Sequence, residues 1–253
     1  GETFVRWFAA LAAGFAQNGA QVSAALAALT EKVFVTSRLF AGYSGALDAG
    51  VLARLIAALP QGAPGGTAAH KRYDAAACAV EIPADVGFCA LGHNLYALGS
   101  SYSGACPVLS SLVSYGYLWN MVRVQGGAYG TGMNVRRSGD IFCYSYRDPN
   151  LDNTRAVFSA VADFIEDFAA QGMPLDDIII GAVNTTDPLL DPAGVCESQC
   201  VRALKGVTPE ELAKTRHELL ATKPADLAAM ADVLRKYARE GKFCTFSGTN
   251  GGA

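Results

Sequence analysis

Apolar residues recur at helical spacing through the first sixty residues of the chain. In residues 3–17 and again in residues 20–35 they fall at i, i+4, i+7 and i+11, which predicts two amphipathic helices. Residues 38–43 are strand-like, and a further helix is expected over residues 48–59. A single strand cannot satisfy its own backbone hydrogen bonds, so we expect it either to join the sheet of the larger domain or to belong to a domain whose remainder is absent from this chain.

Strand patterns come before helical ones in the rest of the chain. Two runs rich in Ala, Val, Ile and Phe predict strands over residues 75–83 and 86–94, and a broad apolar stripe predicts a helix over residues 107–124. A hairpin with its turn at residues 137–140 follows. Its second strand alternates between two largely apolar sets, so we expect both of its faces to be covered. The two sets are Ile141, Cys143 and Ser145, and Phe142, Tyr144 and Tyr146.

The C-terminal part is nearly all helical. Helices are predicted from Asn150 to a stop at Gly172 and then over four further ranges, before a closing strand at residues 242–247. Those ranges are 174–184, 192–205, 209–221 and 224–239. Thr208 and Glu211 have the spacing of a capping box at the start of one of them. The order predicts an α+β fold, a two-layer sandwich of a mostly antiparallel sheet with helices on one face.

A run dense in proline and glycine, residues 60–67, indicates a linker. We therefore expect one domain to include residues 1–60, a linker at residues 61–69, a second domain over residues 70–247 and a flexible tail at residues 248–253.

Composition narrows the classes of function. The chain has 253 residues, 51% of them hydrophobic and 17% charged, as expected of a well-packed globular protein. A net charge of −3 gives no reason to expect a nucleic-acid partner, which needs a concentrated basic face. No apolar run reaches the roughly 20 residues of a membrane span, so we expect no membrane partner.

The seven cysteines are mostly placed in apolar runs, where a thiol packs as a small hydrophobe. This usage is typical of a reducing compartment, so the cytoplasm is the expected location and an organelle matrix the alternative. Cys196 and Cys200 could face one another on a helix, but no second pair completes a zinc site. We expect them to be buried bystanders, with a redox or metal sensor as a remote alternative.

Several kinds of catalytic centre lack their motifs. The three histidines, His70, His93 and His217, form neither His-Glu-x-x-His nor His-x-x-Glu-His, and there is no Cys-x-x-Cys. No Gly-x-Ser-x-Gly elbow is present either. The glycines of residues 127–132 superficially resemble a phosphate loop, but they precede a strand and lack the Lys-Ser/Thr pair. We therefore expect no metal, no nucleotide and no catalytic residue in this chain.

Arg123 and Tyr129 are the long polar side chains at the junction between the helix over residues 107–124 and the hairpin. One interpretation is structural: Arg123 caps the helix C-terminus, and Tyr129 is a core aromatic with an exposed hydroxyl. The other is functional: guanidinium and phenol hydrogen-bond a peptide carbonyl, and Gly126 and Gly127 let a substrate backbone come close. The residues by themselves leave both open.

Three motifs here resemble the C-terminal part of the pitrilysin/insulinase family of zinc metallopeptidases, in its presequence-protease and falcilysin branch. They are Tyr-Leu-Trp-Asn-Met-Val-Arg at residues 117–123, Gly-Gly-Ala-Tyr-Gly at 126–130 and Ser-Tyr-Arg-Asp-Pro at 145–149. The resemblance covers about residues 70–247 as the family's last domain. It covers residues 1–60 less securely, as the tail of the preceding domain of the same kind, whose sheet would accept the strand at residues 38–43.

The resemblance implies a function. Family members resemble clamshells of four related domains that enclose a chamber, with zinc bound in the first domain. An arginine and a tyrosine of the last domain face that zinc, and by motif these are Arg123 and Tyr129. They would hold the backbone of an unfolded peptide substrate, with Gly126 and Gly127 beside them.

The zinc helix of the family has no counterpart in this sequence. The resemblance therefore implies that zinc is bound outside this chain and that the chain by itself is inactive. Its partner would be an N-terminal zinc-bearing half, in the same polypeptide or as a separate subunit. The alternative function is a non-catalytic assembly or peptide-binding subunit.

Overall fold

The computed structural model describes residues 2–62 and 76–248. Residues 63–75, which include His70 and most of the expected linker, lie outside the described residues, as do residues 249–253 of the expected tail. The chain divides into two compact units. Unit 1 consists of residues 1–73 and 190–206, and unit 2 of residues 74–189 and 207–253.

Unit 1 is helical in its described part. Its elements are α1 (Glu2–Ala13), α2 (Phe15–Val33), the 3-10 turn η1 (Thr36–Arg38), α3 (Ala49–Ala58) and α8 (Pro192–Leu204). The three helices predicted before residue 60 are therefore present. The grouping differs from the expected domains because α8 clusters with unit 1 and not with the rest of residues 70–247. Within the unit, Gly42 lies against the Cys196 and Cys200 side chains of α8.

The strand expected at residues 38–43 is absent from the described structure. Arg38 ends η1, and residues 39–44 are irregular. Val35 and Leu39 have extended backbone angles, but no strand of unit 1 lies beside them to pair with. An extended segment without a partner cannot become a strand, because its N–H and C=O groups need a ladder.

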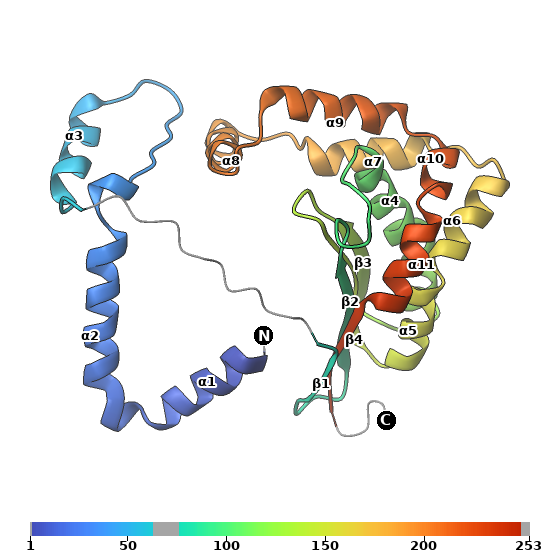
Figure 1. Cartoon of the computed structure of the whole chain (residues 1–253), viewed down its shortest axis with the longest axis horizontal. Helices are drawn as coiled ribbons and strands as arrows, with labels where there is room; N and C mark the ends of the chain where they lie inside the picture. The colour runs from blue at the N-terminus through green and yellow to red at the C-terminus, as the bar shows by residue number, and fades with distance from the viewer. Residues whose placement is uncertain (1, 63–75, 249–253) are drawn as a thin grey trace. The chain divides into compact units, whose positions relative to one another are not determined.

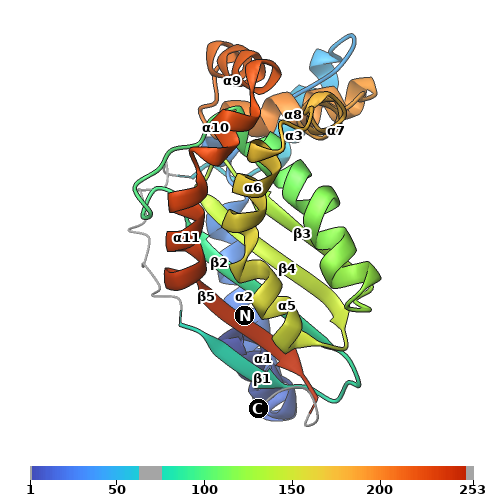
Figure 2. The ribbon, with the colours of Figure 1, turned by 90° about the vertical axis from the view of Figure 1, so that its right-hand side faces the viewer.

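Unit 2 contains one five-stranded sheet. Its strands are β1 (Cys78–Glu81), β2 (Gly87–Asn94), β3 (Gly130–Val135), β4 (Asp140–Asp148) and β5 (Lys242–Ser247). They lie in the order β1-β5-β2-β4-β3 (Figure 2), and Figure 1 views the sheet from its edge. All neighbours are antiparallel except β1 and β5, so the mostly antiparallel sheet is confirmed.

The helices of unit 2 that contact the sheet cover one of its faces, which confirms the α+β sandwich (Figure 2). The helices of this unit are α4 (Ala105–Ser111), the π-helix η2 (Leu112–Val124), α5 (Leu151–Ser159), α6 (Val161–Ala170), α7 (Asp176–Thr186), α9 (Pro209–Ala221), α10 (Pro224–Ala228) and α11 (Ala231–Glu240). The predicted capping box of α9 is present, with Glu211 N–H donating to Thr208 Oγ1 at 3.2 Å.

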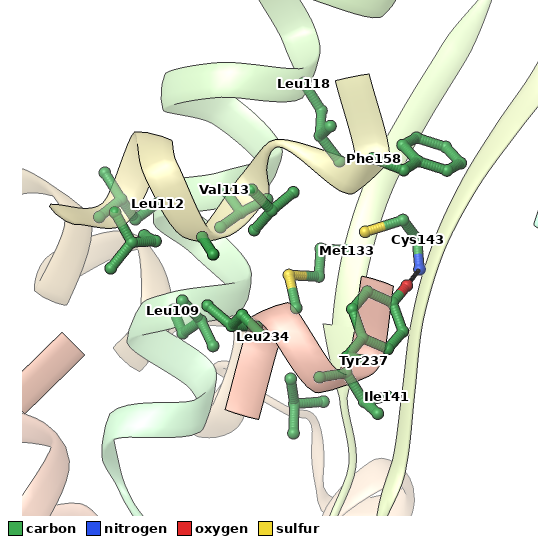
Figure 3. Packing of buried hydrophobic residues seen from close by; sticks show 14 of the residues in the cluster. Leu109, Leu112, Val113, Leu118, Met133, Ile141, Cys143, Phe158, Leu234 and Tyr237 are labelled. Atoms are coloured by element: carbon green, nitrogen blue, oxygen red, sulfur yellow. Dashed lines mark hydrogen bonds between the residues drawn. The ribbon is translucent and has the colours of Figure 1, made fainter. Parts of the chain in front are cut away.

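The core fills the space between this helical layer and the sheet (Figure 3). Leu109 of α4 and Phe158 of α5 are fully buried there, beside Ile141 and Cys143 of β4. Tyr237 of α11 is also fully buried. Its hydroxyl donates to Leu91 O at 2.7 Å and accepts from Cys143 N–H at 2.9 Å, so it bridges the backbones of β2 and β4.

The second face of the sheet is open within unit 2. The alternation along β4 is confirmed, since Ile141, Cys143 and Ser145 are buried. The expectation that the other face would be covered is wrong for this unit, because Tyr144 and Tyr146 are 37% and 47% exposed. Tyrosine tolerates such a position because its ring is apolar and its hydroxyl is polar.

The helix predicted over residues 107–124 changes its hydrogen bonding midway. It is α-helical to Ser111 and then widens into η2, which ends with Gln125 N–H donating to Asn120 O, five residues back, at 2.9 Å. The buried residues Val113, Leu118 and Val122 follow each other at intervals of five and four. Helices of this type are rare and frequently occur at functional sites.

Candidate functional site

Arg123 lies in the last turn of η2 with its side chain half-buried. Its guanidinium carbon is 3.9 Å from the centre of the Trp119 ring, one turn earlier. Among the described residues it makes no hydrogen bond or ion pair with another side chain. The stacking fixes the direction of the guanidinium and leaves its N–H groups available to a ligand.

Gly126 and Gly127 end η2. A Cβ on Gly126 would lie 2.5 Å from Val122 O, and Gly127 has a φ of +82°, which L side chains rarely adopt. Gly127 N–H donates to Arg123 O at 3.0 Å. Both glycines are thus explained by the way the helix ends. Their expected role in admitting a substrate backbone stays a prediction.

Tyr129 follows directly, just before β3. Its N–H is shared between Tyr146 O at 3.1 Å and Arg147 O at 3.2 Å, so its backbone is fixed to β4. Its ring and the Tyr146 ring pack edge to face with their centres 5.8 Å apart, and the Tyr129 side chain is 65% exposed. Tyr129 is therefore not a core aromatic, and its hydroxyl is accessible.

Arg147 comes to the same place through a β-bulge. Gly87 pairs with Asp148 and Phe88 with Tyr146, so Arg147 is the extra residue of β4. Its φ of +50° is the one positive value at a non-glycine residue in the described ranges. Such a conformation costs roughly 1–2 kcal/mol and is often found at functional sites. The bulge turns the side chain so that its guanidinium lies 5.9 Å from the centre of the Tyr129 ring.

These side chains line one shallow hollow of about 660 Å³. Its lining residues are Val86, Trp119, Arg123, Val124, Gly127, Ala128, Tyr129 and Arg147. The fold therefore brings together three of the four predicted site residues, Arg123, Tyr129 and Gly127, while Gly126 lies outside the lining. Two guanidinium groups and a phenol without any carboxylate offer hydrogen-bond donors, which suits carbonyl or carboxylate oxygens.

Metal ligands do not gather in the described residues. No three His, Cys, Asp or Glu side chains there could hold a metal ion together. His93 Nδ1 accepts from Asn94 N–H at 2.8 Å. The side chains of residues 2–62 and 76–248 therefore do not fit a zinc site.

The thiols divide into buried and half-buried groups. Burial raises the pKa of Cys89 to about 11 and that of Cys143 to about 12, so both stay protonated in the core. Cys196 and Cys200 are half-buried, so the expectation that they are buried is wrong. Desolvation and the neighbouring Cys200 thiol raise the pKa of Cys196.

None of the helices in residues 2–62 and 76–248 has the length and apolar character needed to cross a bilayer.

Five lining residues of the hollow were not predicted as site residues, and two of them, Trp119 and Arg147, hold or supply a guanidinium group. Trp119 is separated from Arg123 by one helical turn, a spacing at which a ring and a guanidinium meet, and this signal was available. Arg147 belongs to the Ser-Tyr-Arg-Asp-Pro motif at residues 145–149, but its place in the hollow could not be found from the motif, since a bulge depends on how two distant strands pair.

Comparison with known proteins gives a consistent family. The family model described as the PreP C-terminal domain matches residues 78–246. Protein HypA of Clostridium perfringens is 32% identical over 160 residues, which is 63% of this chain and 16% of that protein. Presequence protease 1, chloroplastic/mitochondrial, of Arabidopsis thaliana is 34% identical over 157 residues, 62% of this chain and 14% of the relative. The chain thus spans about a sixth of the length of these relatives.

Solved structures share the fold at low identity. The peptidase M16 inactive domain from Pseudomonas fluorescens superposes with a TM-score of 0.55 at 13% identity, covering 81% of this chain and 51% of that one. A protease from Helicobacter pylori gives a TM-score of 0.54 at 12% identity, over 80% of this chain and 54% of the other. At these identities the likeness shows the architecture alone.

Proposed function

Because this chain belongs to the family described as the PreP C-terminal domain, we propose that it is the substrate-binding part of a zinc-dependent metalloendopeptidase. The enzyme degrades unstructured peptides in a closed chamber. This part binds no zinc, and Arg123 and Tyr129 hold the substrate backbone opposite the zinc of an N-terminal half. That half belongs to the same polypeptide or to a partner subunit.

The observation that carries the proposal is the hollow that Arg123 and Tyr129 share. Its polar side chains are hydrogen-bond donors, and no carboxylate of the described residues lines it. A ligand oxygen that accepts hydrogen bonds is therefore its best complement. A peptide in extended form offers such oxygens along its backbone whatever its side chains are. A site of this kind therefore favours binding many unrelated unfolded sequences.

The two side chains have different tasks. The Arg123 guanidinium, steadied by the Trp119 ring at 3.9 Å, donates to a substrate carbonyl and holds the peptide in position. The Tyr129 hydroxyl donates to the carbonyl oxygen that gains negative charge during hydrolysis. Zinc, bound in the other half, would polarise that carbonyl and activate water.

The open face of the sheet supports the same proposal. Phe88 of β2 and Tyr146 of β4 stand on it with their rings 5.2 Å apart, and Tyr144 is exposed on the same face. Tyr146 also contacts the Tyr129 ring, so the aromatic surface continues into the hollow. An unfolded peptide exposes apolar side chains, and this surface would shelter them from water.

The compartment is part of the proposal. One relative is named chloroplastic/mitochondrial and another, 29% identical over 191 residues in Emericella nidulans, mitochondrial. An organelle matrix is therefore a candidate beside the cytoplasm. We propose neither a nucleic-acid nor a membrane partner, given the net charge of −3 and the absence of a spanning helix in the described residues.

Turnover of a quenched, unstructured peptide tests the proposal, with the zinc-bearing half supplied in the same polypeptide or in trans. We expect Arg123→Ala and Tyr129→Phe each to lower kcat/KM by about 100-fold, the loss typical of removing one preorganised donor. Trp119→Leu should give a smaller loss through a higher KM, because the guanidinium is then free to move.

Matched controls separate this from loss of fold. Arg155→Ala removes an arginine whose guanidinium carbon lies 5.1 Å from the centre of the Phe243 ring and which does not line the hollow. Tyr115→Phe changes an exposed tyrosine of η2, the helix that also contains Arg123. Both should keep full turnover. Unchanged turnover in Arg123→Ala and Tyr129→Phe would refute the site. No turnover with any zinc-bearing half, together with peptide binding, would favour the non-catalytic subunit.

A further inference from the structure

Cys78 and Cys244 face each other across the single parallel strand pair of the described sheet. They are register partners of β1 and β5. Neighbouring strands lie about 4.7–4.9 Å apart, within the 4.4–6.8 Å separation of Cα atoms that a disulfide requires. Register partners project to the same face of a sheet, so the two thiols point the same way. Neither is part of a disulfide in this structure.

The pair lies on the open face of the sheet. Phe243, the residue before Cys244, packs against the core, so Cys244 points to the other face. Cys78 and Cys244 are both half-buried, and no helix of unit 2 covers them. Cys244 Sγ donates to Ala76 O at 3.6 Å, which shows that this thiol leans over the chain leading into β1. Each side chain is therefore partly accessible to a small thiol reagent.

No other pair of cysteines combines this geometry with access. Cys196 and Cys200 are four residues apart on the single helix α8, so they are not register partners of two strands, and a bond between them would fasten no strand of the sheet. Cys89 and Cys143 lie on neighbouring strands, but both are buried with raised pKa values. A disulfide forms from a thiolate, which burial disfavours.

We propose that Cys78 and Cys244 are a reversible disulfide site that fastens the edge strand β1 to β5. β1 is four residues long and is paired on one side only, so few ladder hydrogen bonds resist its adjustment to the bond. The bond would join the first strand of unit 2 to its last, 166 residues later in the chain. Under reducing conditions the two cysteines stay as thiols, and under oxidative stress the disulfide fastens the edge strand.

The oxidant is a small disulfide such as oxidised glutathione. A thiolate of one cysteine attacks it, forms a mixed disulfide and releases one glutathione thiolate. The second cysteine, as thiolate, attacks the mixed disulfide at the protein sulfur and releases the other glutathione. Both cysteines lose their protons to solvent or to the departing thiolates, the protein gives up two electrons, and the glutathione disulfide takes them up.

Thiol counting and peptide mapping test this proposal. The full chain is incubated with oxidised glutathione, its remaining thiols are alkylated, and it is digested without reductant. We expect the alkylated thiols to fall from seven to five, with a linked pair of peptides containing Cys78 and Cys244. The linked chain should unfold at a higher temperature than the reduced chain, since the bond closes a long loop. Dithiothreitol should restore both properties.

Variants make the test specific. Cys78→Ser and Cys244→Ser should each abolish the link, while the double variant Cys196→Ser/Cys200→Ser should still form it, its thiols falling from five to three. Retained near-ultraviolet circular dichroism shows that each variant is folded. The proposal is overturned if peptide mapping finds both Cys78 and Cys244 alkylated, if each carries its own glutathione, or if the disulfide joins two chains.

Discussion

The two units use similar apolar helices with opposite results. In unit 2, Leu109, Phe158 and Ile165 are fully buried between the helical layer and the sheet. In unit 1, helices α2, α3 and α8 contain no buried residue. Phe8 of α1 and Phe15 of α2 are 55% and 57% exposed. Apolar periodicity predicts a helix and its apolar face, but burial also requires a layer for that face to pack against.

Unit 2 has such a layer in its five-stranded sheet, and no strand is found in the described part of unit 1. The aromatic rings of α1 and α2 therefore have no layer to pack against within unit 1, and exposed apolar clusters of this kind usually mark a surface that another part of a protein covers. We propose that residues 1–60 are the tail of a preceding domain, whose sheet covers these helices and pairs with residues 38–43. The difference between the units would then be one of missing partners.

The largest expected effect removes one phenylalanine from each unit. Phe158→Ala should lower the free energy of unfolding of unit 2 by about 3–5 kcal/mol, because it leaves a cavity in a closed core. Phe8→Ala should change the stability of the chain by no more than about 0.5 kcal/mol, because its ring is already half in water. Urea unfolding measures both.

The chain offers a separate probe for each unit. Its two tryptophans are Trp7 in unit 1 and Trp119 in unit 2, so Trp7→Phe leaves fluorescence that reports unit 2, and Trp119→Phe leaves a probe of unit 1. Equal losses from Phe158→Ala and Phe8→Ala in these backgrounds would show that unit 1 has a core of its own, and the comparison would fail.

A tyrosine hydroxyl gives the next largest contrast. Tyr237→Phe removes the group that joins Leu91 O and Cys143 N–H, at 2.7 and 2.9 Å, inside the core. Leaving these buried groups without that partner should cost about 1–3 kcal/mol. Tyr43→Phe in unit 1 changes a side chain that is 62% exposed and should have no measurable effect. Thermal unfolding of both variants provides the measurement, and a neutral Tyr237→Phe would mean that the hydroxyl bridge is not formed.

Local signals in the sequence were sufficient for much of the fold. The capping box of α9 depends on Thr208 and Glu211, which are three residues apart, and the hairpin turn depends on the residues between β3 and β4. Features that depend on contacts between distant parts of the chain could not be predicted from local signals. β5 inserts between β1 and β2, and the π-helix η2 packs on β3, which follows it in the chain but pairs with β4.

The site follows the same division. Arg123 and Tyr129 could be chosen because they are long polar side chains at a junction of two elements. That Tyr129 is exposed, that Gly126 lies outside the hollow and that Arg147 enters it could not be predicted. The position of Arg147, for example, depends on the bulge opposite Gly87 and Phe88, about sixty residues earlier in the chain.

Helix caps should matter more where burial is missing. Asp48 caps α3 in unit 1 by accepting from Gly50 N–H at 2.8 Å and Val51 N–H at 3.2 Å. Asp48→Ala should cost about 1 kcal/mol and raise amide exchange throughout α3, because no buried side chain holds that helix. Thr208→Ala in unit 2 should raise amide exchange only in the first turn of α9, because the buried Leu219 holds the other end of that helix in the core. Exchange confined to the first turn in both would remove the contrast.

The smallest expected effect concerns the surface of unit 2. Arg235 of α11 donates to Glu166 of α6, with Nη1 2.8 Å from Oε1, and this hydrogen bond lowers the pKa of Glu166. A carboxylate with a lowered folded pKa stabilises the fold above its unfolded pKa, and the stabilisation is lost as pH falls through the folded value. Both side chains are exposed, so the effect is small and screened by salt.

Arg235→Met should therefore lower the urea midpoint of the Trp7→Phe chain slightly at pH 7. The difference from the parent should persist down to about pH 4.5, the ordinary pKa of glutamate, and shrink below it as Glu166 is protonated in both folded states. The Trp119→Phe chain, which reports unit 1, should show no difference at any pH. A difference that is the same at pH 7 and pH 3 would mean that Arg235 acts through its apolar stem and not through the ion pair.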